Sequence, residues 1–113
     1  MTNGDIYEGK FKNDMREGFG RMSYAEGNVY EGEFVADKRE GRGKLIYNTG
    51  DKYEGGFKND VQEGKGTHFY KNGETYVGYF VGGQREGDGV LYDSDGKILK
   101  EEDGNAPDSA VSA

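Results

Sequence analysis

Residues 30–43 read YEGEFVADKREGRG, and this stretch decides the fold because it recurs every 23 residues. The other copies read YEGKFKNDMREGFG at 7–20, YEGGFKNDVQEGKG at 53–66 and YVGYFVGGQREGDG at 76–89. A fixed period without insertion or deletion is typical of repeat proteins, in which each unit stacks on its neighbours. We therefore expect an extended functional surface rather than one catalytic pocket.

Two kinds of turn divide each unit into antiparallel strands. The central pair of each copy suits a two-residue type I′ turn, which needs positive φ at both positions. The units are joined by three-residue loops ending in glycine, a pattern typical of a type I turn followed by a bulge residue. The central pairs are Asn13-Asp14, Ala36-Asp37, Asn59-Asp60 and Gly82-Gly83, and the loops are 25–27, 48–50, 71–73 and 94–96.

The turns predict the strand register. Centring the first turn places Gly9 opposite Gly18 and Tyr7 opposite Gly20, so that each tyrosine ring lies across a glycine. Centring the joining loop pairs Gly20 with Gly32. Both turns keep the same residues on the same face. The fold class we predict is all-β: a single-layer, twisted antiparallel meander of hairpin repeats, with eight or nine strands, elongated over about 40 Å.

The repeats divide the chain into two parts. Residues 1–100 form the predicted repeat domain, with four full units and a degenerate fifth. In the fifth unit Leu99 replaces the repeat tyrosine and Glu101 replaces a glycine. Residues 101–113 form an acidic tail that we expect to be disordered.

Composition excludes several classes of function. The chain has 113 residues and a formal net charge of −7, and its last 13 residues carry four acidic and no basic side chains. The remaining body has no single-sign field that would favour nucleic acid. There is no cysteine and one histidine, so we expect no enzyme activity, no cofactor and no metal site. The absence of a signal or membrane-length apolar segment predicts a cytoplasmic protein.

One face of the predicted sheet carries nearly all the aromatic rings. Rigid aromatic side chains favour binding, so this face is a candidate groove for an extended peptide or an amphipathic helix. The same rings are also needed as the core of a one-layer protein, and both roles are compatible where ring edges stay exposed. The candidate groove residues are Tyr7, Phe11, Tyr30, Phe34, Tyr47, Tyr53, Phe57, Tyr70, Tyr76 and Phe80. His68 lies on this face and is expected to be a packed ring.

The opposite face becomes more apolar toward its C-terminal end. The predicted register aligns Phe69, Thr75 and Val90 across three strands and places Tyr79 between Lys65 and Glu86. We expect a docking or self-association patch here, with an ordinary scattered surface as the alternative. The candidate residues of this back-face patch are Phe69, Val77, Tyr79, Val90 and Tyr92.

The repeated motifs together resemble the MORN (membrane occupation and recognition nexus) repeat family over about residues 4–99. The resemblance implies a hairpin array that acts as a non-catalytic, protein-binding scaffold of a cytoskeletal, ciliary or membrane-associated assembly. At residues 16–18 and their equivalents, where members often carry a basic residue followed by His and Gly, this chain has Arg-Glu-Gly or Gln-Glu-Gly. The loss of the histidine makes the surface more acidic, so the lipid binding associated with the family is less expected for this chain.

The scaffold could act as a homodimer, and two alternatives to it stay open. The first is a phospholipid-binding (phosphoinositide-binding) module that uses bases near the first two hairpins. The second is an accessory region of a larger enzyme. The bases of the first alternative are Lys10, Lys12, Arg16, Arg39 and Arg42.

Overall fold

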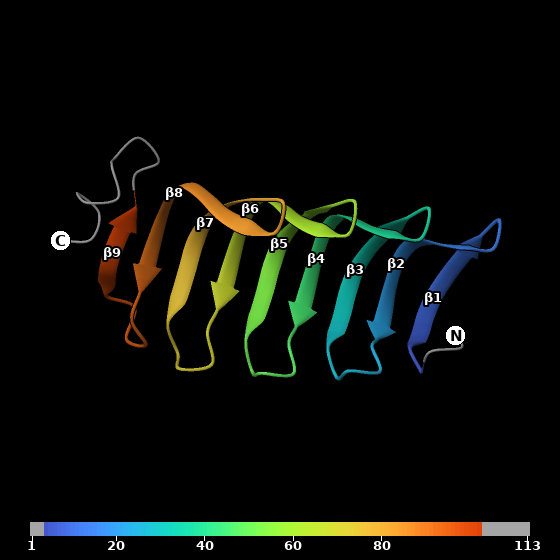
Figure 1. Cartoon of the computed structure of the whole chain (residues 1–113), viewed down its shortest axis with the longest axis horizontal. Helices are drawn as coiled ribbons and strands as arrows, with labels where there is room; N and C mark the ends of the chain where they lie inside the picture. The colour runs from blue at the N-terminus through green and yellow to red at the C-terminus, as the bar shows by residue number, and fades with distance from the viewer. Residues whose placement is uncertain (1–3, 103–113) are drawn as a thin grey trace.

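The computed structural model describes residues 4–102, which form one antiparallel sheet of nine strands in chain order (Figure 1). Four hairpins, β1–β2, β3–β4, β5–β6 and β7–β8, are followed by the single strand β9. This confirms the predicted meander. The described part contains no helix that could cross a membrane. The strands are β1 (Ile6–Lys12), β2 (Met15–Ser23), β3 (Val29–Val35), β4 (Lys38–Ile46), β5 (Lys52–Lys58), β6 (Val61–Phe69), β7 (Thr75–Val81), β8 (Gln84–Tyr92) and β9 (Ile98–Glu102).

Both predicted turn types are present. All eight residues of the two-residue turns have positive φ, including Ala36 at 49° and Asp37 at 71°. In the joining loops, the Gly27 amide donates to the Tyr24 carbonyl over 2.9 Å, and the Tyr24 amide donates to the Asn28 carbonyl over 2.8 Å. This is the hydrogen-bond pattern of a type I turn closed by a bulge glycine.

The register inside each hairpin differs from the prediction. Gly9 lies opposite Gly20 rather than Gly18, and Tyr7 lies opposite Met22. A bulge in the second strand causes this shift of two residues, and Gly18, with φ of 80°, lies in it. Because the shift is even, every side chain stays on its predicted face. The other three hairpins shift in the same way.

The tyrosine ring still covers glycine, as predicted. A Cβ atom built on Gly9 or Gly20 would lie 2.5 Å from the Tyr7 hydroxyl oxygen. The Tyr7 ring therefore lies diagonally across Gly9 and Gly20, which face each other on neighbouring strands. The Tyr7, Tyr30 and Tyr53 hydroxyls each donate to a backbone carbonyl three residues further on, which holds the rings in this position.

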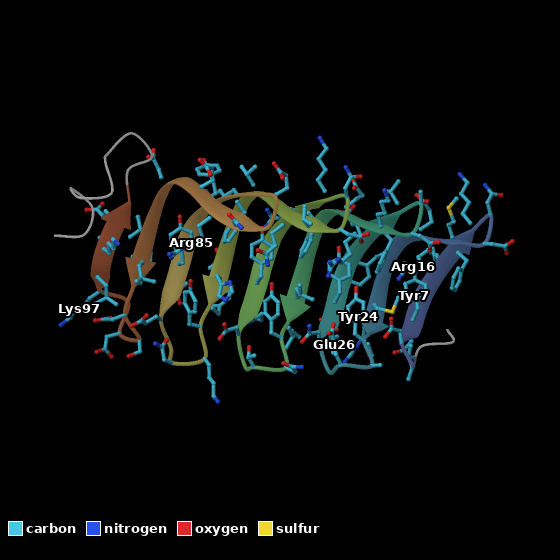
Figure 2. All side chains as sticks on the ribbon, viewed as in Figure 1. Tyr7, Arg16, Tyr24, Glu26, Arg85 and Lys97 are labelled. Carbon is cyan, nitrogen blue, oxygen red and sulfur yellow. The ribbon has the colours of Figure 1, made fainter. Side chains whose placement is uncertain are left out.

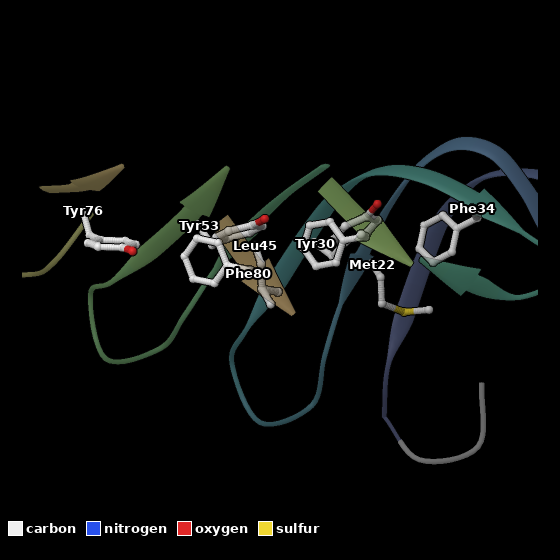
Figure 3. Close-up of a cluster of buried hydrophobic side chains, with 8 residues drawn as sticks. Met22, Tyr30, Phe34, Leu45, Tyr53, Tyr76 and Phe80 are labelled. Atoms are coloured by element: carbon white, nitrogen blue, oxygen red, sulfur yellow. The ribbon is translucent and has the colours of Figure 1, made fainter. Parts of the chain in front are cut away.

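The core is a line of alternating tyrosine and phenylalanine rings on one face of the sheet, called here the inner face (Figure 3). Each interior phenylalanine contacts the tyrosine of its own hairpin and that of the preceding one. Phe34, for example, meets Tyr7 and Tyr30 edge to face, with centroid distances of 5.3 and 5.1 Å. Such contacts add about 0.5–1.5 kcal/mol each to the burial term. They connect successive hairpins into one core.

The last strand is irregular. Lys100 lies opposite Leu91 and Ile98 opposite Tyr92, so that Leu99 has no paired residue and is half-exposed. The prediction that Leu99 takes the tyrosine place is therefore wrong, because a one-residue slip moves the following side chains to the other face. β9 also includes Glu101 and Glu102, two residues of the predicted tail. The rest of that tail lies outside the described residues.

Candidate functional site

Most of the predicted groove rings lie beneath the inner surface rather than on it. Six of the ten are core residues that are at most 4% exposed, because neighbouring rings and folded-over turns cover them. The structure corrects the prediction for these six: they support the inner face and, apart from Phe57 at the floor of a hollow, contribute no surface. The six are Tyr30, Phe34, Tyr53, Phe57, Tyr76 and Phe80.

The tips of the second, third and fourth hairpins each pack on the preceding hairpin, and this contact shapes the inner face. The Asp37 carboxylate accepts hydrogen bonds from the Arg16 amide over 2.7 Å and from Arg16 Nε over 2.9 Å. Arg16 Nη2 also donates to the Asp37 carbonyl over 2.7 Å. These hydrogen bonds from the Arg16 backbone and side chain lower the pKa of Asp37. Arg39 and Asp60 repeat the amide and Nη2 hydrogen bonds one hairpin further on, but Arg39 Nε lies 3.6 Å from the Asp60 carboxylate, which is an ion pair without a hydrogen bond.

A carboxylate completes each of these junctions. Glu17 accepts a hydrogen bond from the Ala36 amide over 3.2 Å, and Glu63 accepts one from the Gly82 amide over the same distance. Glu40 does the same for Asn59. The glutamate of the repeated Glu-Gly-x-Gly therefore anchors the first turn residue of the next hairpin.

A hollow of about 360 Å³ opens on the inner face between the folded tips and the joining loops. The half-buried rings of Tyr24 and Tyr47 line it, together with Arg39 and Gln62. Figure 2 shows Tyr24 near the loop end of the hairpins, with Glu26 beyond it. We call this hollow the inner groove. Aromatic walls with a few polar groups are typical of ligand sites.

The polar groups of the inner groove are held in place. Gln62 Nε2 donates to the Tyr47 hydroxyl over 2.5 Å. The guanidinium carbon of Arg39 lies 5.9 Å from the centre of the Tyr24 ring and 5.5 Å from that of Phe57. Burial raises the pKa of both Tyr24 and Tyr47. Both hydroxyls therefore stay neutral, and each keeps a proton to donate.

His68 packs between two tyrosine rings next to the inner groove. It stacks on Tyr47 with 5.9 Å between centroids, and it lies against Tyr70 at a tilt of 31° with 4.4 Å between centroids. Its Nε2 lies 3.3 Å from the Asp51 carboxylate. The Lys71 amide and His68 donate hydrogen bonds to that carboxylate and lower its pKa. The prediction that His68 is a packed ring is confirmed.

Sequence reasoning missed Tyr24, Arg39 and Gln62 as groove residues. Tyr24 was recognisable, since it shares its place in the repeat with Tyr47 and Tyr70. Arg39 and Gln62 share the inner face with Phe34 and Phe57, their partners in the register, but the hollow that they line forms only when the hairpin tips fold over that face. Phe11, by contrast, lies at the N-terminal edge, far along the sheet from this hollow, and is exposed.

Four of the five residues of the back-face patch lie in two rows across strands β6 to β8, and Tyr79 lies in a third. The predicted alignment of Val90 with Thr75 is wrong, because the bulge in β8 moves Val90 opposite Val77. The predicted place of Tyr79 between Lys65 and Glu86 is confirmed. The first two rows are Thr67, Val77, Val90 and Phe69, Thr75, Tyr92.

The N-terminal half of the back face is charged instead. A row of alternating sign crosses the first five strands, with Arg21 3.5 Å and Lys44 3.8 Å from the Glu31 carboxylate. The row consists of Glu8, Arg21, Glu31, Lys44 and Glu54. Of the five bases proposed for lipid, Arg16 and Arg39 are engaged by aspartates on the inner face.

Comparison with known proteins adds one finding. A family model described as MORN repeat matches four consecutive segments, residues 7–29, 30–52, 53–75 and 76–98. These segments begin at the four repeat tyrosines and have the period of the hairpins. No curated protein matches the chain.

Proposed function

The chain belongs to the MORN repeat family, and on this premise we propose that it is a non-catalytic scaffold that binds a partner protein through the inner groove. One observation carries the proposal: the hollow of about 360 Å³ between Tyr24, Tyr47 and Arg39, which the core rings leave open. Its partner is an extended peptide or one face of an amphipathic helix, because both kinds of ligand place side chains into aromatic hollows on a protein surface. The proposed setting is a cytoskeletal, ciliary or membrane-associated assembly in the cytoplasm.

The chemistry of the groove supports a peptide ligand. Tyr24 and Tyr47 offer apolar ring surface with a neutral hydroxyl, a combination that binds side chains with little loss of conformational entropy. Arg39 and Gln62 supply N–H donors near the ring surfaces, and Glu26 and Asn28 supply acceptors at the loop end. Backbone carbonyls and amides of an extended peptide need donors and acceptors of this kind.

Peptide selection tests the proposal. Binders are selected from a random-peptide display library on the immobilised chain and then titrated against the variants Tyr24→Ser and Tyr47→Ser. The back-face variant Phe69→Ser is the matched control, because it removes a half-buried ring from the other side of the same sheet. We expect at least about a tenfold loss of affinity for each groove variant, the scale of a binding hot spot, and no change for the control.

Two results would count against the inner groove. Binders that Phe69→Ser weakens while both groove variants leave them unchanged would move the site to the back face. Binding to phosphoinositide vesicles at low salt, lost on charge reversal of Lys10 and Lys12, would favour the lipid-binding alternative.

A further inference from the structure

The N-terminal edge of the described sheet lacks the cover that the interior hairpins receive from their neighbours. Interior phenylalanines are at most 4% exposed because a tyrosine of the preceding hairpin covers each of them, whereas Phe11 is 62% exposed. Beside Phe11 lies a hollow of about 510 Å³ that Tyr7 and Ile6 also line. β1 is the outermost strand of the described sheet, so its outer edge presents N–H and C=O groups to solvent. Such an edge is a template for another strand.

The sequence of β1 is complementary to itself about Gly9. When two copies of β1 pair antiparallel with Gly9 opposite Gly9, Glu8 of each copy lies opposite Lys10 of the other. On the inner face, Tyr7 of each copy then lies beside Phe11 of the other. Cross-strand pairs of opposite charge and of aromatic rings are both favourable.

This register shares its central glycine pair with the junctions between hairpins inside the molecule. There, too, glycine pairs with glycine across an antiparallel junction, as Gly20 does with Gly32 and Gly43 with Gly55. The charge pattern also continues. Lys10 of the second copy beside Glu8 extends the alternating back-face row into the neighbouring molecule.

The opposite edge lacks these features. β9 has five residues, is interrupted at Leu99, and ends in Lys100-Glu101-Glu102. Antiparallel self-pairing centred on Lys100 or on Glu101 places like charges opposite each other. A short, irregular and charged strand is one of the ways in which proteins protect a sheet edge.

From these observations we infer that β1 is an interaction surface for a second copy of this chain. The two β1 strands pair antiparallel about a two-fold axis through Gly9 and join the two sheets into one. Because that axis is perpendicular to the sheet, the inner faces of both copies lie on the same side. The dimer thus presents two inner grooves to one partner or membrane-bound assembly. This inference does not depend on the proposed peptide ligand.

A charge swap tests the interface. The molar mass of the full chain is measured by sedimentation equilibrium over a range of concentrations, for wild type, Lys10→Glu and the double variant Glu8→Lys/Lys10→Glu. Both side chains are exposed, and circular dichroism checks that each variant folds. We expect a wild-type dimer, a dissociation constant on the order of tenfold higher for Lys10→Glu, and recovery in the double variant.

Other results overturn the inference. A chain that stays monomeric up to its solubility limit has no such interface. A dimer that Lys10→Glu leaves unchanged but Tyr79→Ser dissociates pairs through the back-face patch instead. A Lys10→Glu variant that dissociates without recovery in the double variant excludes the proposed register.

Discussion

The junction between the second and third hairpins differs from the junction between the third and fourth. At the junction between the second and third hairpins, Arg39 and Asp60 form an ion pair. The Arg39 amide donates to the Asp60 carboxylate, and Arg39 Nη2 donates to the Asp60 carbonyl. At the other junction, Gln62 and Gly83 hold the same places, and the Gly83 amide donates to the Gln62 carbonyl over 3.0 Å. The hairpin tip packs on its neighbour in both cases. Backbone and glutamate hydrogen bonds therefore suffice for packing, and the ion pair is an added restraint.

The difference teaches how a repeat protein divides its roles. Two elements that recur along the array define the fold: the ring over paired glycines in every hairpin, and the anchoring glutamate at every junction between hairpins. Elements that vary between junctions adjust local stability and the groove wall, since Arg39 and Gln62 both line the hollow. The predictions below act first on the shared elements and then on the variable ones.

The largest effect is expected from Gly43→Val, which breaks a feature common to all four hairpins. A Cβ atom at Gly43 would lie 2.5 Å from Cε1 of the Tyr30 ring, which is fully buried and has no space to move into. Overpacking of this severity costs about 3 kcal/mol or more. Urea denaturation of the variant and wild type measures it.

Gly64→Ala is the matched control for that substitution. Gly64 has φ of 83° and no atom within 4 Å of a built Cβ, so only the left-handed backbone is strained. That strain costs about 1–2 kcal/mol. Equal losses in the two variants would contradict the packing of Tyr30 against Gly43.

The next effect removes the difference between the two junctions. The double variant Arg39→Gln/Asp60→Gly gives the junction between the second and third hairpins the residues found at the junction between the third and fourth. Because Asp60 is half-exposed and glycine relieves its positive φ of 74°, we expect a net loss of only about 1 kcal/mol. A double-mutant cycle with the two single variants measures the coupling energy, and a coupling near zero would show that the ion pair adds nothing.

The reverse change should strengthen the junction between the third and fourth hairpins. Gln62→Arg/Gly83→Asp introduces the ion pair there, at the cost of the Gln62 bond to Tyr47. We expect a gain of about 0.5 kcal/mol, confined to the fourth hairpin because repeats interact with their neighbours only. Amide hydrogen exchange should slow in β7 and β8 and stay unchanged in β1. Uniform slowing over all strands would contradict a local effect.

The smallest effect is expected from acid, which should weaken the junctions that contain an aspartate more than the Gln62–Gly83 junction. The pKa of Asp37 is lowered from its ordinary value of 3.8, so its contribution to stability is complete above that value. The contribution is lost as the pH falls through the lowered pKa of the folded state. Gly83 carries no carboxylate at the equivalent place. In Asp37→Asn, the free energy of unfolding should therefore fall less steeply as the pH is lowered. An NMR titration of the Asp37 side-chain carboxyl carbon in the wild type checks the shifted pKa.

Much of the candidate site followed from local signals. Positive-φ pairs such as Asn13-Asp14 marked the turns, and the alternation of side chains assigned each ring to the inner face. The inner groove could not be derived in the same way. Whether a ring such as Tyr53 is core or surface depends on what covers it, and that cover comes from a neighbouring hairpin.

Sequence by itself determined the repeat, the turns, the order of strands and the two faces, because all of these depend on residues close together in the chain. Only the tertiary structure decided the two-residue shift at Gly18, the slip at Leu99 and the folding of Asp60 onto Arg39. Each of these results from hydrogen bonds between strands or hairpins, formed where the bulge directs the chain. An even shift preserves the alternation of side chains, so the sequence pattern is the same with or without it.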